Sequence, residues 1–287
     1  MADELLLGTS ILEIIKKRIS VRTYLEHPLT SETKDNLRAF YSSISGPFGV
    51  PIRFELIESD LALKGSNIKL GTYGVIKGAS TYVVAAVVKS NKDLEEFGYV
   101  LEKLILYATS LGLGTCWLGG TFKKSEFSKA IKQKDNESLP CITPIGSPSS
   151  RKSFLESAMR FAVGSNNRKS WEELFYKGDF GHKLPESEAG KYAVPLKMLR
   201  LAPSASNKQP WRIIQDKTKL HFYLQHTKGY AKQQAHDLQR VDIGIAMCHF
   251  ELTAKEMGIV GKWVISDPDA ISTPVNTEYV VSWVEVS

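Results

Sequence analysis

The chain has 287 residues, of which 43% are hydrophobic and 24% are charged, and its formal net charge is +6. This is the composition of an ordinary globular protein, long enough for one large domain or two modest ones. The three cysteines, Cys116, Cys141 and Cys248, stand singly without a Cys-x-x-Cys. The spacing argues against a disulfide framework and a zinc site and favours a reducing, cytoplasmic setting.

Two further classes of protein fit poorly. No apolar run approaches the ~20 residues that cross a bilayer, and acidic residues precede the short apolar patch at the start of the chain. The lysines and arginines are spread along the chain rather than gathered in a basic stripe, which argues against nucleic-acid binding. The six histidines show no metal-ligand spacing. We therefore expect no membrane, nucleic-acid or metal partner, and a small anionic ligand fits the charge better.

Apolar periodicity predicts helices and strands in alternation along the chain. Helices are expected over 10–18, 30–41, 97–111 and 124–132. Strands rich in β-branched and aromatic residues are expected over 52–59, 81–90, 211–216, 219–226 and 278–286. The predicted class is α+β, with mixed β-sheets flanked by helices.

The chain also repeats itself at an offset of 146 residues. The segments Phe97–Trp117 and Ile243–Trp263 align without a gap, and each is predicted to form a buried helix that ends at a glycine and is followed by a short strand. Five positions are identical: Gly98/Gly244, Leu106/Leu252, Ala108/Ala254, Gly112/Gly258 and Trp117/Trp263.

A second pair of segments precedes these two helices in the same order. Ser43–Ile57 resembles Ala202–Gln215, with a Pro-x-Arg in each. Chance likeness between two amphipathic helices is the alternative, but two motifs that recur in one order favour duplication. We expect two similar halves, 1–165 and 166–287, arranged as a dimer fused into one chain.

The first chemical cluster is RISVRTY, Arg18–Tyr24. Arg18, Ser20 and Arg22 alternate, so in an extended segment their side chains point the same way and could bind a phosphate. The alternative is a helix C-terminus whose cations complement the helix dipole. That alternative suits Lys16 and Lys17 but explains Arg22 poorly.

Two later clusters add glycines and cations. The pair Gly119-Gly120 in GTCWLGG would let the backbone approach a planar ligand closely. Arg151 and Lys152 follow a Ser/Pro turn in GSPSSRKSF, where basic residues are usually solvated. The sequence contains no GxGxxG or GxxxxGK, so Rossmann and P-loop nucleotide sites are not supported.

In this order, RISVRTY, GLGTCWLGG, PIGSPSSRK and APSASNKQPW (Ala202–Trp211) resemble the FMN-dependent nitroreductase family in its duplicated, TM1586-type form. The resemblance implies that FMN is the cofactor. It implies that the late loop, which comes from the second subunit in dimeric relatives, is supplied here by the same chain. The implied flavin-binding residues are Arg18, Ile19, Ser20, Arg22, Tyr73, Gly74, Leu118, Gly119, Gly120, Arg151, Pro203, Ser204, Ala205 and Asn207.

The duplication could create two flavin sites, but the one in the second half is expected to be eroded. The second half keeps Arg168 and Ser170 but has Glu172 where Arg22 would fall, and a carboxylate opposes phosphate binding. The first half has SISGPFG in place of APSASNK. We therefore expect one FMN per chain and no obligate partner chain.

The resemblance implies an oxidoreductase that uses NADH or NADPH to reduce nitro compounds, quinones or similar small-molecule acceptors, with hydride transfer at flavin N5. No side chain is assigned to catalysis, because the cofactor carries this chemistry. The alternative is a non-enzymatic FMN-binding or flavin-storage protein that has kept the fold. The sequence does not select the physiological acceptor, the nicotinamide or the state of assembly.

Overall fold

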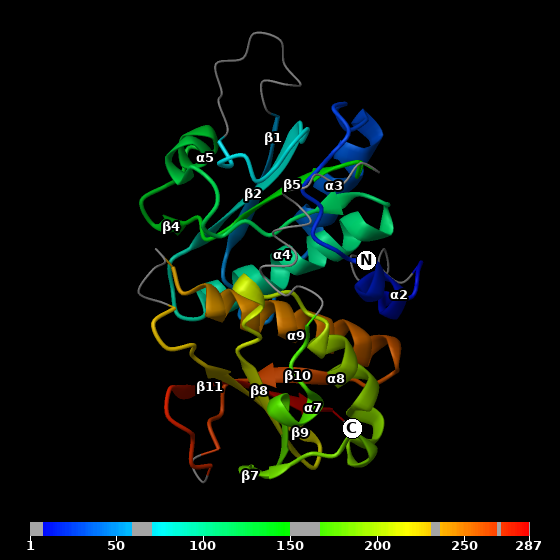
Figure 1. Ribbon diagram of the computed structural model, residues 1–287, viewed down its shortest axis with the longest axis vertical. Coiled ribbons are helices and arrows are strands. Elements are labelled where there is room, and N and C mark those ends of the chain that lie inside the picture. The colour runs from blue at the N-terminus through cyan, green and yellow to red at the C-terminus, as the bar shows by residue number, and fades with distance from the viewer. Residues whose placement is uncertain (1–7, 59–70, 150–166, 231–235, 269–270, 287) are drawn as a thin grey trace. The chain divides into compact units, whose positions relative to one another are not determined.

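The computed structural model describes residues 8–58, 71–149, 167–230, 236–268 and 271–286. The chain divides into two compact units, Met1–Ser165 and Asn166–Ser287. Each unit combines one β-sheet with helices, which confirms the predicted α+β class (Figure 1).

The first unit builds an antiparallel sheet from short strands. Its elements are α2 (Ile11–Lys17), α3 (Ser31–Ser43), β1 (Ile52–Glu58), β2 (Thr81–Val88), α4 (Asp93–Ser110), β3 (Gly114–Thr115), α5 (Lys124–Ala130), β4 (Glu137–Ser138) and β5 (Ile142–Gly146). The strand order is β1-β2-β5-β3, with β4 beside β2, and all four of these pairings are antiparallel.

Strand β2 forms the buried centre of this sheet. Its sequence TYVVAAVV has little polar character, and its first seven residues are all buried. Alternate side chains of a strand face opposite sides. Tyr82, Val84 and Ala86 share a core cluster with Phe127 of α5, while the strand also packs against α4. Helices thus cover both faces, which explains why the sequence of this strand is a continuous apolar run.

The second unit has a six-stranded sheet of order β10-β11-β9-β8-β6-β7, in which only the pairing of β6 with β8 is parallel. Its elements are α7 (Trp171–Leu174), β6 (Phe175–Lys177), β7 (Asp179–Lys183), η1 (Glu186–Glu188), η2 (Gly190–Tyr192), α8 (Ala193–Arg200), η3 (Ala205–Asn207), β8 (Trp211–Asp216), β9 (Lys219–Gln225), α9 (Leu238–Glu256), β10 (Gly261–Val264) and β11 (Thr277–Glu285).

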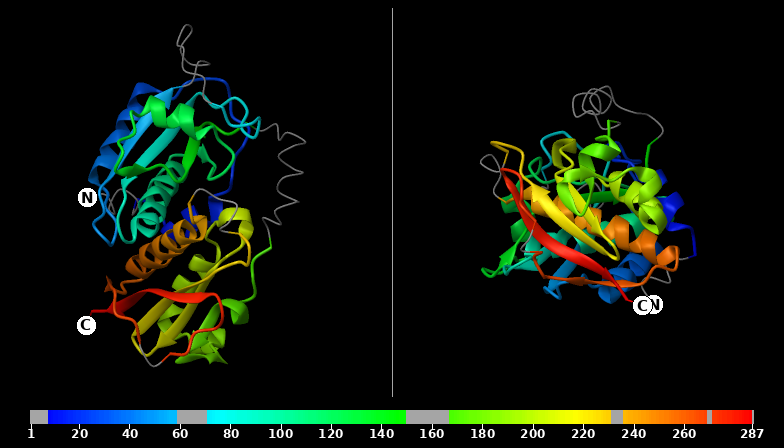
Figure 2. Two further views of the ribbon diagram at one scale, coloured as in Figure 1. Left: turned by 90° about the vertical axis from the view of Figure 1, so that its left-hand side faces the viewer. Right: turned by 90° about the horizontal axis from the view of Figure 1, so that it is seen from below.

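The two sheets share a strand order. The order β1-β2-β5-β3 in the first unit corresponds to β8-β9-β11-β10 in the second, and each neighbouring pair is antiparallel in both. In both units the long helix follows the second of these strands and packs on the sheet (Figure 2). The predicted two similar halves are therefore present as two sheets of like topology.

The long helices α4 and α9 also end alike. Gly112 and Gly258, at corresponding positions, have φ of +74° and +73°. The next residue donates its amide to the carbonyl five residues earlier, at 2.9 Å for Leu113 and 2.8 Å for Ile259. This bond pattern with a left-handed glycine is the Schellman C-cap, which explains why glycine occurs at this point of both copies.

Most predicted elements lie within a few residues of their expected bounds. The helix expected over 97–111 spans 93–110, and the strand expected over 278–286 spans 277–285. Helix α8 and strands β6 and β7 were not predicted. Strand β7 is exposed along most of its length, so it has no apolar alternation to detect.

Candidate functional site

The segment Arg18–Tyr24 is an extended strap, as the alternation of its side chains predicts. Ser20 forms a parallel bridge with Thr115 of β3, and the amide of Val21 donates to the Thr115 carbonyl at 2.8 Å. Further along, Thr23 forms a parallel bridge with Lys77. Backbone bonds therefore hold the strap on both sides of Arg22, and the helix ends before it at Lys17.

Arg22 has two guanidinium nitrogens without a hydrogen-bond partner in the described residues. Its Nε and Nη1 atoms are buried and, within the described part of the chain, have no hydrogen-bond partner. Leaving a buried donor without a hydrogen bond costs about 1–3 kcal/mol, and more for a charged group. A dianionic phosphate would satisfy both atoms, so this residue fits the phosphate of FMN.

Arg18 is already engaged in part. Its side chain is 8% exposed, and its Nε lies 3.9 Å from Oε1 of Glu102, which is fully buried in α4. The other oxygen of Glu102 accepts a hydrogen bond from Trp117 Nε1 at 2.7 Å. The strap, the long helix and the GTCW segment therefore meet at one carboxylate. Glu102 was not predicted from the sequence, although an acid inside an apolar helix was a signal that could have found it.

The glycines of GLGTCWLGG have separate tasks. A Cβ on Gly114 would lie 2.9 Å from Cβ, Cγ1 and Cγ2 of Val21, so only glycine lets the strap lie this close to β3. Gly112 instead caps α4, and a Cβ there would meet nothing within 4 Å. The first glycine of GTCWLGG thus positions the strap, and the preceding one ends a helix.

Replacing Gly114 by alanine should displace the strap and weaken FMN binding about tenfold, because ~1.4 kcal/mol of lost contact energy is a factor of ten. The measurement is an FMN titration followed by flavin fluorescence. Gly112→Ala is the matched control, since it strains a left-handed position by roughly 1–2 kcal/mol but leaves the strap alone. Equal loss of FMN affinity in both variants would show that Gly114 acts only through stability.

The residues predicted near flavin N5 differ in burial and in backbone hydrogen bonding. Leu118 is buried, and its amide already donates to the Ile142 carbonyl at 3.0 Å. That amide is therefore engaged within the sheet, and the contact of Leu118 with the flavin stays a prediction. Gly119 is half-buried and Gly120 is exposed, so these two remain the candidates for backbone contact.

Tyr73 and Gly74 form the tip of a tight turn. Their φ angles are +48° and +74°, and the amide of Val75 donates to the Thr72 carbonyl at 2.9 Å. Two consecutive positive φ values across a four-residue turn give the type I′ geometry. Tyr73 is 66% exposed, so a large aromatic side chain is held at a strained tip in solvent, where a ligand could contact it.

The late loop is also strained. Ser206, Asn207 and Gln209 all have positive φ, from +48° to +54°, without being glycine. Ser204 is extended and its Oγ accepts from the Gln209 amide at 2.9 Å. Such conformations cost about 1–3 kcal/mol each and persist where surrounding contacts impose them, often at binding sites.

Asn207 has a structural task in the second unit. Its Oδ1 accepts from Arg168 Nη1 at 2.7 Å, and its Nδ2 donates to the Asn167 carbonyl at 2.7 Å. Arg168 also donates to the Leu201 carbonyl at 3.1 Å. Both residues therefore stabilise the loop. The terminal nitrogens of Arg168, which corresponds to Arg18 in the repeat, are used in these bonds.

In the described part of the second unit, the segment that corresponds to the strap leads into a short helix and has Glu172 in place of Arg22. Where the first unit is extended, Ser170 caps the short helix α7 in a capping box with Glu173. Glu172 lies exposed in that helix. Among the other residues predicted to bind flavin, Ile19 is 45% exposed, and Pro203 and Ala205 are half-buried. Arg151 lies outside the described residues.

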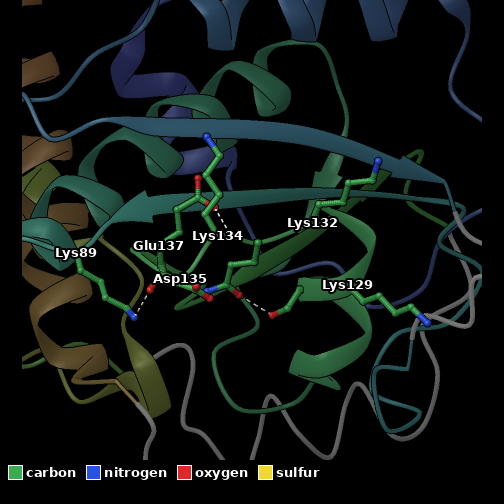
Figure 3. Close-up of a pocket in the computed structure, with 8 residues that line it drawn as sticks. Lys89, Lys129, Lys132, Lys134, Asp135 and Glu137 are labelled. Carbon is green, nitrogen blue, oxygen red and sulfur yellow. Dashed lines mark hydrogen bonds between the residues drawn. The ribbon is translucent and has the colours of Figure 1, made fainter.

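A surface pocket of about 600 Å³ lies elsewhere in the first unit (Figure 3). It is lined by Lys89, Ser128, Lys129, Lys132, Gln133, Lys134, Asp135 and Glu137. None of the predicted flavin residues borders it. The side chains of Lys129 and Lys132 extend away from the other labelled groups in Figure 3. Arg53 donates to both oxygens of Glu137 at 2.8 Å and holds the pKa of that carboxyl at about 2.

The described residues contain no group of three or more His, Cys, Asp or Glu side chains placed to hold a metal ion. In the same part of the chain, no helix combines the length and the apolar character that crossing a membrane requires.

Comparisons with known proteins agree on the nitroreductases. A model of the family described as "Putative TM nitroreductase" matches residues 10–254. The chain is 26% identical over 175 residues to an Archaeoglobus fulgidus protein named "Putative NADH dehydrogenase/NAD(P)H nitroreductase". This alignment covers 56% of the present chain and 98% of the Archaeoglobus fulgidus protein.

Solved structures also align with this chain. A Thermotoga maritima structure described as a "putative nitroreductase" aligns with a TM-score of 0.62 and 20% identity over 96% of this chain and 94% of its own. A nitroreductase family protein from Clostridium novyi NT aligns with a TM-score of 0.40 and 23% identity, over 50% of this chain and 87% of its own. The Thermotoga maritima match confirms the predicted fold.

Proposed function

We propose a function from one premise: the chain belongs to the nitroreductase family whose model spans residues 10–254, as its four motifs predict. The chain is accordingly an oxidoreductase. Its proposed cofactor is FMN, and its proposed reaction is the reduction of nitro compounds, quinones or similar acceptors with NADH or NADPH. The name of the Archaeoglobus fulgidus relative supports a nicotinamide as the electron donor.

The observation that carries this proposal is the pair of guanidinium nitrogens of Arg22, Nε and Nη1, that have no hydrogen-bond partner among the described residues. A strap fixed by backbone bonds on both sides presents two buried nitrogens with no partner in the described residues. The protein gives up hydrogen-bond energy to keep them so, which is expected of a preorganised anion site. Ser20 would add a hydroxyl, and Arg18 would add charge although it shares Glu102.

The remaining contacts are proposed from the family motifs. Gly119 and Gly120 would border the flavin ring, and Tyr73 and Gly74 would line it. When bound, FMN supplies two-electron chemistry between a reduced nicotinamide and an acceptor. The task of this chain is to bind and orient the reactants.

The same chain is proposed to complete its own site. Pro203, Ser204, Ala205 and Asn207 would lie against the flavin that the strap holds, in the role that a second subunit has in dimeric relatives. The duplicated topology supports such a pseudo-dimer. One FMN per chain is proposed because Glu172 stands where the second half would need an arginine. No partner chain is then needed for the flavin site, and the proposed location is the cytoplasm.

The test begins with the freshly purified protein. We expect a yellow protein that releases one FMN per chain on heating, identified by mass, and whose bound flavin is bleached by NADH or NADPH in anaerobic stopped-flow measurements. Release of FAD, or a protein that does not bind FMN when it is added, would contradict the cofactor assignment. Bound FMN that neither nicotinamide reduces would favour the flavin-storage alternative.

A further inference from the structure

The two repeated loops each lie on an acid of the following long helix. Aligned on their prolines, Pro51 and Pro210, the loops 43–51 and 202–210 correspond position by position. The 146-residue offset of the long helices places Glu96 of α4 at the same position as Asp242 of α9. Both acids are buried, at 1% and 2% exposure. Since buried acids are uncommon, one at the same point of both copies calls for a physical explanation.

In the first unit the loop backbone converges on the carboxylate. The amide of Phe48 donates to Oε2 of Glu96 at 2.8 Å. Burial raises the pKa of Glu96, and the backbone amides of Phe48, Gly46, Gly49 and Val50 oppose that rise. Successive amides directed at one point form a nest, which is an arrangement that binds anions.

The fit around this carboxylate is close. A Cβ on Gly46 would lie 2.5 Å from Cδ and Oε2 of Glu96. The residue at this position must therefore be glycine for the carboxylate to enter. The loop closes around the acid rather than passing over it.

The second unit also has a loop over a buried acid, but fewer of its amides reach the carboxylate. Ala205, the counterpart of Gly46, donates its amide to Oδ1 of Asp242 at 2.9 Å. The following amides turn back on the loop, that of Asn207 to the Ser204 carbonyl and that of Gln209 to the Ser204 hydroxyl. Oδ2 of Asp242 is buried with no hydrogen-bond partner in the described residues. With one methylene fewer, aspartate anchors a single amide.

We propose that the loop 43–51 is an anion-binding nest of backbone amides, which the side chain of Glu96 occupies in cis. The internal carboxylate makes this loop a closed structural element. The corresponding loop of the second unit donates the Ala205 amide to Asp242 and is not filled in this way. This proposal does not depend on flavin binding, so either can fail alone.

The test removes the internal ligand and offers it back from solution. Glu96→Ala deletes Cγ and the carboxylate, which together have the atoms of acetate. We expect the thermal midpoint of the variant to fall by roughly 5 °C, from the loss of charge-assisted hydrogen bonds. Sodium acetate should restore it in a saturable manner, compared with sodium chloride at equal ionic strength. Formate should restore less, and wild type should not respond.

Two further variants keep the result interpretable. Glu95→Ala is the matched control, because Glu95 is the adjacent buried acid and pairs with Lys92 at 3.6 Å. It should gain nothing specific from acetate. Glu96→Gln keeps the volume but places an amide NH2 among backbone N–H donors, so its midpoint should also fall. A folded Glu96→Ala that acetate stabilises no more than chloride does, or a Glu96→Gln variant of wild-type stability, would overturn the proposal.

Discussion

Replacing Arg22 by glutamate should yield a folded protein that purifies without flavin. Loss of a hydrogen bond to a charged group costs about 1.5–3 kcal/mol, which corresponds to roughly a 10- to 150-fold loss of affinity. The glutamate adds repulsion of the phosphate to that loss. The stability of the apoprotein should change little or increase, because the buried guanidinium atoms have no partner in the described residues. The measurements are the flavin-to-protein absorbance ratio and the thermal midpoint.

A comparison of ligands separates phosphate binding from general damage. Riboflavin lacks the phosphate, so Arg22→Ala should weaken FMN binding strongly and riboflavin binding hardly at all. Arg38→Glu makes the same charge change at an exposed pair with Asp35 in α3 and should bind FMN as wild type does. Equal losses for FMN and riboflavin in Arg22→Ala, or full flavin in Arg22→Glu, would contradict the assignment of the phosphate to Arg22.

The sequence predicted well those features that depend on local patterns. Strand β2 and helix α4 are long apolar segments, and the helix ends at Gly112 because a left-handed C-cap favours glycine. The repeat at 146 residues predicted a second helix with the same cap, which is α9 ending at Gly258. These signals lie within a few residues of the structure that they specify.

The site was predictable only in outline, because its details depend on residues far apart in the chain. The alternation of Arg18 and Arg22 predicted an extended segment, which the bridge to β3 confirms. It could not reveal that Glu102, 84 residues later, faces Arg18 but leaves Arg22 without a partner among the described residues. Nor could it reveal that the Leu118 amide is taken by β5. Such pairings follow from sheet order, which local patterns do not encode.

The shared carboxylate of Glu102 gives the second large prediction. Replacing Glu102 by alanine leaves the buried Arg18 without its counter-charge and Trp117 Nε1 without its acceptor. Breaking a buried pair in this way costs about 3–5 kcal/mol, so the free energy of unfolding should fall by that amount in urea titrations. Glu102→Gln keeps an acceptor for Trp117 and should lose less.

A natural control exists in the second unit. Trp263 corresponds to Trp117 in the repeat, and its Nε1 donates to Glu251 at 2.6 Å, although this acid lies one helical turn later than Glu102 in the alignment. Glu251 also pairs with Lys255, which is 40% exposed and lies at 3.4 Å. Glu251→Ala should therefore cost only about 1–3 kcal/mol, the loss of one hydrogen bond to a charged group. The difference between the two alanine variants measures the contribution of the buried Arg18. If the two lose equal stability, Arg18 does not depend on Glu102, and its charge is then as free for a phosphate as that of Arg22.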